Sequence, residues 1–181
     1  MRFELKAPVM AKPPLLVPRP EGLYCPEGDF FIDPTRPVPR ALITHGHSDH
    51  ARPGHGAVMA TRETLDIMAI RYGEDFTQSR QSAEGPTRIG SVTVSFHPAG
   101  HVLGSAQIAV ESAAQRITVS GDYARVPTPT CAPFEPVPCD IFVTEATFAL
   151  PVFRHPPPQV QIARLLARVS AASPPVQAWS R

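Results

Sequence analysis

Seven consecutive residues, Thr44 to His50, place three histidines and one aspartate in a single short segment directly after the apolar run at residues 41–43. Alternate side chains of an extended segment point the same way, so His45 and His47 share one side, while Asp49 and His50 can turn toward a neighbouring position. Imidazole nitrogens and carboxylate oxygens suit zinc, with iron and manganese as alternatives. The segment therefore predicts a site for two adjacent divalent metal ions.

One loop does not complete such a site, and two further candidates lie downstream. His101 follows an expected strand at residues 91–96 and has glycines at positions 100 and 104, which let the backbone turn closely around a ligand. Asp122 follows the β-branched run at residues 117–119, so it also leaves a strand. We place Asp122 between the ions, because each of its oxygens can bind one of them. The first ion would have three histidine ligands, namely His45, His47 and His101, and the second would have Asp49 and His50.

Short strands must carry these candidates to one place. Alternating apolar and β-branched residues predict nine strands, near Leu15–Val17, Gly22–Cys25, Phe30–Ile32, Arg40–Thr44, Ala57–Ala60, Val92–Phe96, Ala106–Val110, Arg116–Ser120 and Ile141–Thr144. Apolar spacing predicts two helices, Arg62–Tyr72 and Gln159–Val169. Two histidines outside the main motif, His55 and His97, are expected at the surface or just behind the ligands.

The ligand-type residues, in this order, resemble the metallo-β-lactamase fold superfamily. The segments around them are similar to the ligase-associated DNA exonucleases, bacterial relatives of the β-CASP nucleases that process RNA 3′ ends or repair interstrand cross-links. The resemblance runs from about residue 14 to about residue 170. It is carried by residues 22–34, residues 97–105, Ser120–Tyr123, Pro127–Phe134 and, for the first β-CASP motif, Val143–Phe148.

This resemblance implies an α/β protein with the four-layer αββα sandwich of the metallo-β-lactamase fold, and a metal-dependent nuclease active in DNA repair. Two metal ions would activate a water to hydroxide for attack on a phosphodiester bond. Asp49 would also accept a hydrogen bond from the attacking group, and Glu145 would orient a general-acid histidine later in the chain. DNA is implied as substrate in preference to RNA, together with association with a DNA ligase and a helicase.

Members of this family are considerably longer than 181 residues, so the sequence looks like the N-terminal half of the fold. We expect a flexible N-terminus at residues 1–13, the first half of the metallo-β-lactamase domain at residues 14–155, and a helix with an atypical tail at residues 156–181, where the β-CASP region would begin. By resemblance, the remaining part holds the general-acid histidine and one further metal ligand. We therefore expect little or no nuclease activity from this chain.

Composition narrows the class of protein. With 43% hydrophobic residues, the chain is long enough for one domain with a sizeable core. It has no segment long enough to span a membrane and no secretory signal, so we expect a cytoplasmic protein. The net charge of +1 gives no electrostatic argument for nucleic acid. Cys25, Cys131 and Cys139 are widely spaced and indicate neither a disulfide framework nor metal ligands.

Two other functions remain open. A small-molecule hydrolase of the same superfamily, acting on thioesters or lactones, would use the same ligands without the Glu145 motif. A non-catalytic remnant would expose an apolar sheet face and fold only in part.

Overall fold

The computed structural model describes residues 14–147, 149–150, 152 and 156–172. The chain divides into two compact units, residues 1–145 and residues 146–181. Within the described residues the first unit contains strands β1 to β11 and helix α1, and the second contains helix α2 (Pro158–Ala172). Neither helix is long and apolar enough to cross a lipid bilayer. The expectation for residues 1–13 lies outside the described part.

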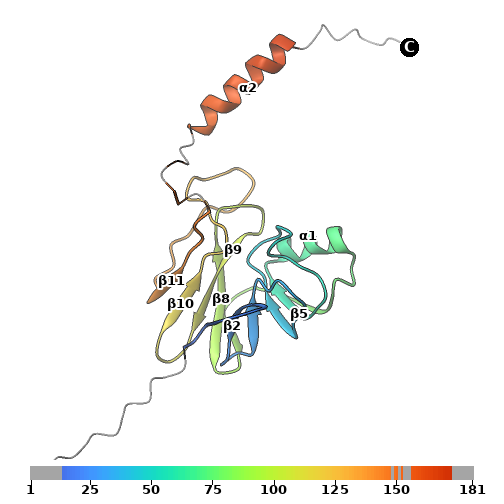
Figure 1. Ribbon diagram of the computed structural model, residues 1–181, viewed down its shortest axis with the longest axis vertical. Helices are drawn as coiled ribbons and strands as arrows, with labels where there is room; N and C mark the ends of the chain where they lie inside the picture. Colours follow the sequence, from blue (N-terminus) through green and yellow to red (C-terminus); the bar gives the residue numbers. More distant parts are fainter. Residues whose placement is uncertain (1–13, 148, 151, 153–155, 173–181) are drawn as a thin grey trace, which may run out of the picture. The chain divides into compact units, whose positions relative to one another are not determined.

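The first sheet has six strands in the order β1-β2-β3-β4-β5-β6. They are β1 (Val17–Arg19), β2 (Gly22–Cys25), β3 (Phe30–Ile32), β4 (Arg40–Leu42), β5 (His55–Ala60) and β6 (Thr77–Ser82). Strands β1 to β3 form an antiparallel meander, whereas β3 to β6 run parallel. Parallel neighbours need a crossover connection, and helix α1 (Arg62–Tyr72) supplies it between β5 and β6 (Figure 1).

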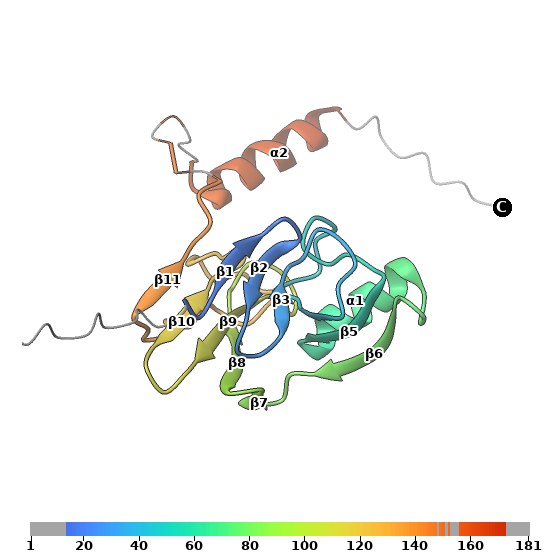
Figure 2. The same ribbon diagram turned by 60° about the horizontal axis from the view of Figure 1, so that its bottom comes forward.

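The second sheet has five strands in the order β11-β10-β9-β8-β7. They are β7 (Thr87–Ile89), β8 (Val92–Pro98), β9 (Ala106–Glu111), β10 (Arg116–Val119) and β11 (Ile141–Val143). Strands β7 to β10 are antiparallel hairpin neighbours, and β11 joins β10 in parallel. In Figures 1 and 2 the two sheets face each other, and α1 lies on the outer side of the first.

Alternation along β4 and β5 explains this layering. Leu42 and Met59 belong to the core between the two sheets, where they join Val94, Ile108 and Val110 of the second sheet. Their neighbours in the sequence point the other way and pack under α1 against Leu65 and Met68. These neighbours are Ala41, Ile43, Val58 and Ala60. Strands buried on both faces are apolar at successive positions. The first unit is thus a mixed α/β structure with two sheets and one covering helix.

Most predicted elements are confirmed. Strands β2 and β3 and helix α1 have the predicted bounds, and α2 extends the predicted helix by one residue at its start and three at its end. Strands β6 and β7 were not predicted. β6 lies at the edge of its sheet and consists of polar residues, so it carries no alternating apolar signal.

The expectation for His55 was wrong. Its side chain is buried, and its Nδ1 accepts a hydrogen bond of 3.3 Å from the Val38 backbone N–H. Its Nε2 has no hydrogen-bond partner among the described residues. Burial lowers the pKa of His55, because the charged imidazolium would lose its hydration. His97 is half-buried and binds the Ser95 hydroxyl at 2.9 Å.

Protonation of His55 should destabilise the fold. Since its pKa is lowered in the folded chain, the unfolded chain takes up a proton first as the pH falls below about 6.5, and the stability from neutral His55 is lost there. In His55→Asn an amide oxygen can accept the Val38 N–H without titrating. Urea unfolding with a chelator present, from about pH 8 to about pH 5, should show the wild type losing more stability than the variant. Parallel profiles would contradict this assignment.

Candidate metal centre

The histidine segment leaves the first sheet at the carboxyl end of β4. The Ile43 N–H still bonds the Met59 carbonyl of β5, but the chain then turns, and the N–H groups of His50 and Ala51 both bond the His47 carbonyl. The Thr44 carbonyl accepts the N–H of Ala106, the first residue of β9. The segment is therefore fixed to both sheets before its side chains are placed.

Four predicted ligands meet at one point, although they come from three segments of the chain. His45 Nε2 lies 3.0 Å from His47 Nδ1, which lies 3.3 Å from His101 Nε2. Asp122 Oδ2 lies 3.8 Å from His45 Nε2 and 3.6 Å from His101 Nε2. All four ligand atoms lie within 4.8 Å of one another. This His/Asp cluster could hold a metal ion.

The distances fit tetrahedral coordination. Ligand atoms about 2.0–2.1 Å from a tetrahedral zinc lie about 3.3 Å from one another. Four of the six separations, at 3.0–3.8 Å, fall around that value, and all six lie within 4.8 Å. Three imidazoles and one carboxylate oxygen are also a donor set that zinc accepts.

The other oxygen of Asp122 faces a second group. Asp122 Oδ1 lies 3.5 Å from His50 Nε2, and Asp49 Oδ2 lies 3.7 Å from the same nitrogen. The Asp49 side chain is 73% exposed, whereas His50 and Asp122 are largely covered. Asp122 thus lies between the His45/His101 pair and His50, and a second ion held by His50 and Asp49 stays a prediction.

Asp33 is a residue whose role the sequence did not reveal. It follows β3, and its carboxylate accepts three hydrogen bonds: from the Thr44 N–H at 2.8 Å, from the Thr44 hydroxyl at 2.6 Å and from His50 Nδ1 at 2.8 Å. Its backbone has a φ of 45°, a left-handed conformation that aspartate tolerates better than most residues. One carboxylate therefore contacts the start and the end of the histidine segment.

These bonds set the tautomers of two ligands. Thr44 donates its hydroxyl proton to Asp33. The hydroxyl oxygen of Thr44 is therefore free to accept a hydrogen bond from the Nδ1–H of His45, 3.0 Å away. His45 Nε2 is then the unprotonated nitrogen and faces the cluster. In the same way, His50 donates its Nδ1 proton to Asp33, so that its Nε2 faces Asp122. Hydrogen bonds of this kind orient metal-binding histidines.

The two histidines differ in proton affinity. Burial, with the neighbouring imidazole of His50, lowers the pKa of His45 to about 3, so His45 is neutral at physiological pH. The hydrogen bond to Asp33 raises the pKa of His50, although burial opposes it. His45 therefore offers a lone pair over a wide pH range, whereas a proton competes for His50.

Glycines with positive φ precede the two downstream ligands. Gly121, with φ of 54°, stands before Asp122, and a Cβ added there would lie 2.7 Å from the Thr44 side chain. Gly100, with φ of 73°, stands before His101, and an added Cβ would lie 2.4 Å from the Ala124 carbonyl oxygen. A larger residue at position 121 would therefore push that turn away from Thr44, and one at position 100 would push its turn away from Ala124.

Glu145 closes the turn after Asp122. Its Oε1 accepts a hydrogen bond of 3.1 Å from the Tyr123 N–H, and the Ser120 N–H bonds the Val143 carbonyl of β11. The carboxylate thus holds the backbone next to a predicted ligand. Support of a general-acid histidine by Glu145 stays a prediction, because His155, the one histidine after Glu145 in the sequence, lies outside the described residues.

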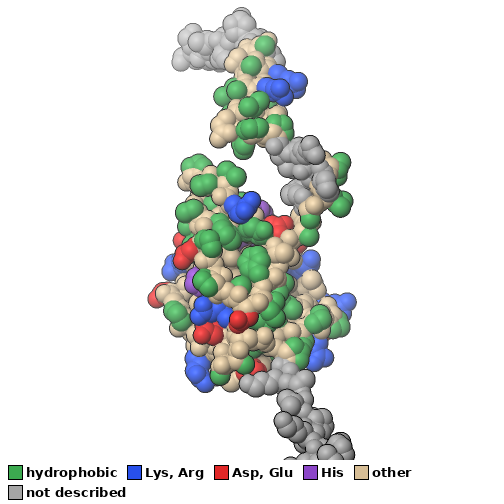
Figure 3. Space-filling model, turned by 90° about the vertical axis from the view of Figure 1, so that its left-hand side faces the viewer, with side chains coloured by type: hydrophobic (Ala, Val, Ile, Leu, Met, Phe, Trp, Pro, Cys, Tyr) green, Lys and Arg blue, Asp and Glu red, His purple; other side chains and the backbone are tan. Residues whose placement is uncertain are grey.

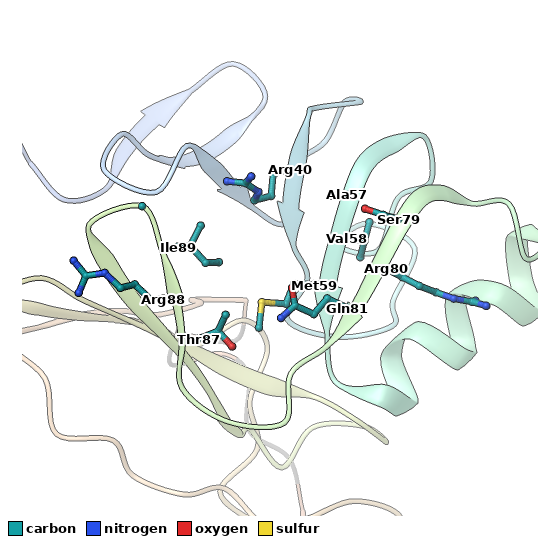
Figure 4. Close-up of a pocket in the computed structure, with 11 residues that line it drawn as sticks. Arg40, Ala57, Val58, Met59, Ser79, Arg80, Gln81, Thr87, Arg88 and Ile89 are labelled. Atoms are coloured by element: carbon teal, nitrogen blue, oxygen red, sulfur yellow. The ribbon is translucent and has the colours of Figure 1, made fainter.

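A cavity of about 420 Å³ lies elsewhere, between β5, β6 and β7, and none of the predicted ligands lines it. Three arginines border it, but Arg80 and Arg88 extend in opposite directions, away from the space between their strands (Figure 4). Arg80 instead pairs with Glu74 at 2.6 Å. The face drawn in Figure 3 likewise shows basic side chains scattered among acidic and apolar ones. Neither place gathers positive charge.

Comparisons with known proteins give relatives that are similar to part of the chain. No family model matches the chain. A probable DNA ligase of Opitutus terrae is 28% identical over 143 residues, which are 75% of this chain and 14% of that protein. Ribonuclease TTHA0252 of Thermus thermophilus is 27% identical over 150 residues, which are 66% of this chain and 34% of that protein. The chain thus spans a minor part of each curated relative.

Two solved structures share a smaller likeness. Zn²⁺-bound PqqB from Methylobacterium extorquens has a TM-score of 0.42 and 13% identity, covering 61% of this chain and 52% of PqqB. A protein of unknown function from Enterococcus faecalis V583 has a TM-score of 0.38 and 19% identity, covering 48% of this chain and 25% of that one. Both TM-scores are too low to carry an argument about this chain.

Asp33→Asn should weaken metal binding without removing a ligand. The variant loses the charge that orients His50 and, through Thr44, His45, and such orienting groups are worth about 10- to 100-fold in metal affinity. Zinc affinity can be measured by competition with a chromogenic chelator. Asp29→Asn is the matched control, because Asp29 also has positive φ but is exposed and bonds Tyr24. Equal zinc affinity in both variants would refute the orienting role.

Acidification should release metal in two steps. Because the pKa of His50 is raised and that of His45 is lowered, protons should displace an ion bound at His50 before one bound at His45. Zinc content after dialysis, followed from about pH 8 to about pH 5, should fall first to a plateau and only later toward zero. Simultaneous loss of all bound zinc would show that the two positions are not distinguished in this way.

Proposed function

We propose that this chain carries the metal centre of a metallo-β-lactamase-fold nuclease, a phosphodiesterase that uses two divalent ions, with zinc preferred over manganese or iron. The observation that carries the proposal is the placement of Asp122. One of its oxygens faces His45 and His101, and the other faces His50. A carboxylate placed between two donor groups is what a two-metal site requires. The similarity to proteins named ribonuclease and DNA ligase supports nucleic acid as the substrate.

When bound, the two ions would acidify a water and neutralise charge that grows on the phosphate. The protein's own contribution is orientation. The exposed carboxylate of Asp49 can accept a hydrogen bond from the attacking water, because it stands at the open side of the second group. Asp33 and Thr44 hold the imidazoles with their lone pairs toward the centre. We propose DNA in preference to RNA, with a ligase and a helicase as associated proteins.

An activated phosphodiester gives the sharpest test. The p-nitrophenyl ester of thymidine 5′-phosphate releases p-nitrophenolate, which needs no general acid, so the assay depends on the metal centre alone. We expect the zinc-loaded chain to hydrolyse it, a chelator to stop the reaction, and Asp122→Asn, which alters a proposed ligand, to slow it by more than the roughly 10- to 100-fold typical of a group that only orients a ligand. Asp66→Asn, an exposed carboxylate on α1 paired with Arg62, should leave the rate unchanged.

The alternatives give different outcomes. Zinc-dependent turnover of a thioester or lactone, with none of the phosphodiester, would replace the proposal with a small-molecule hydrolase. No zinc-dependent turnover of any of these substrates would favour a non-catalytic protein. Labelled single-stranded DNA and RNA of the same sequence then test the natural substrates, for which leaving-group protonation matters and little or no turnover by this chain is expected.

A further inference from the structure

A second cavity shares a loop with the metal centre. Its volume is about 260 Å³, and its wall is mainly apolar, formed by Phe96, Pro98, Val102, Leu103 and Ala132. Glu63, at the start of α1, and His97 of β8 are also among its lining residues. Nothing in the metal chemistry described above uses this cavity.

The loop at residues 101–105 joins the cavity to the centre. His101 lies in the ligand cluster, while the next two residues, Val102 and Leu103, line the cavity. The Ser105 hydroxyl accepts the N–H groups of His101 and Val102 at 3.0 and 3.1 Å. The Gly104 carbonyl accepts the hydroxyls of Thr61 and Thr64 at 2.6 and 3.1 Å. These bonds fix the cavity at a set place beside the ligands.

The lining is suited to a flat, weakly polar group and not to a phosphate. The lining residues include no lysine or arginine to bind an anion, and their acidic and imidazole side chains are Glu63 and His97. An apolar wall that includes an aromatic ring binds a nucleobase by stacking and contact. Glu63 has no hydrogen bond or ion pair among the described residues, so its oxygens can accept an amino proton from a base edge. The volume is below the roughly 300–1,000 Å³ of drug-sized pockets, which suits a single ring system.

We propose that this cavity binds the base of a nucleotide that flanks the hydrolysed phosphodiester bond. The inference rests on the proposed nuclease function and adds a binding site to it. The phosphate is held at the metal centre, and the neighbouring base enters the cavity along the 101–105 loop. The protein then recognises two parts of one nucleotide, with the phosphate on one side of the loop and the base on the other.

Nuclear magnetic resonance of the zinc-loaded chain separates the two parts of the proposal. The ligands are a phosphorothioate-linked tetramer of deoxyadenosine and a tetramer of the same charge without bases. We expect both to shift the backbone signals of residues 44–50. Only the tetramer with bases should shift the methyl signals of Val102 and Leu103.

Leu103→Ser supplies the matched perturbation. Leu103 is 51% exposed, so the substitution should not unfold the chain, and Ile70→Ser, at an 88% exposed position on α1, is the control. The change at Leu103 should weaken binding of the adenine tetramer about tenfold and leave binding of the abasic tetramer unchanged. The change at Ile70 should alter neither.

Each result decides between the proposals. Shifts at residues 44–50 with both ligands, but none at Val102 and Leu103, would overturn the base site and leave the nuclease function intact. No shift with either ligand would overturn nucleic-acid binding, and the base site with it. Equal weakening of both tetramers by Leu103→Ser would show that the loop acts only on the metal centre.

Discussion

The Asp33 carboxylate is the contact on which the candidate centre depends. It bonds the backbone and hydroxyl of Thr44 and the imidazole of His50, and through the Thr44 hydroxyl it fixes the proton on His45. A largely covered carboxylate is costly unless its oxygens are bonded, and here three donors serve both of them. The same bonds that offset the burial of this charge also aim His45 at the ligand cluster and His50 at the other oxygen of Asp122.

The position of the centre follows from how the two sheets meet. β4 ends at residue 42, and Thr44 then bonds Asp33 after β3 and Ala106 at the start of β9. Thr44 also packs on Gly121, directly before Asp122. The ends of strands from both sheets therefore converge on one residue. Backbone placed just beyond such ends is held by the sheets, and the hydrogen bonds of Asp33 then orient the side chains.

Sequence patterns could predict the ligands but not what orients them. His45, His47, His101 and Asp122 were predicted from residue type and strand exits, and the structure brings them together. Asp33 stood in a segment of the family resemblance with no assigned role, because its contacts with Thr44 and His50 are 11 and 17 residues distant in sequence. Strand β6 was missed for a related reason, since pairing at a sheet edge needs no apolar pattern. The role of Asp33 and the existence of β6 both depend on long-range contacts, which residue type and apolar spacing do not reveal.

The charges around the candidate metal centre bear on the anionic substrate that we propose for it. Asp49 and Asp122 both face the centre, and the buried His45 stays neutral, so the protein alone presents a negative charge there. The arginines at the larger cavity diverge, and the chain as a whole has a net charge of only +1. A phosphate would therefore be repelled by these carboxylates unless cations compensate them. Under the proposed function, bound divalent ions would reverse the sign of the local charge, and affinity for a phosphodiester, not only its turnover, would depend on the metal.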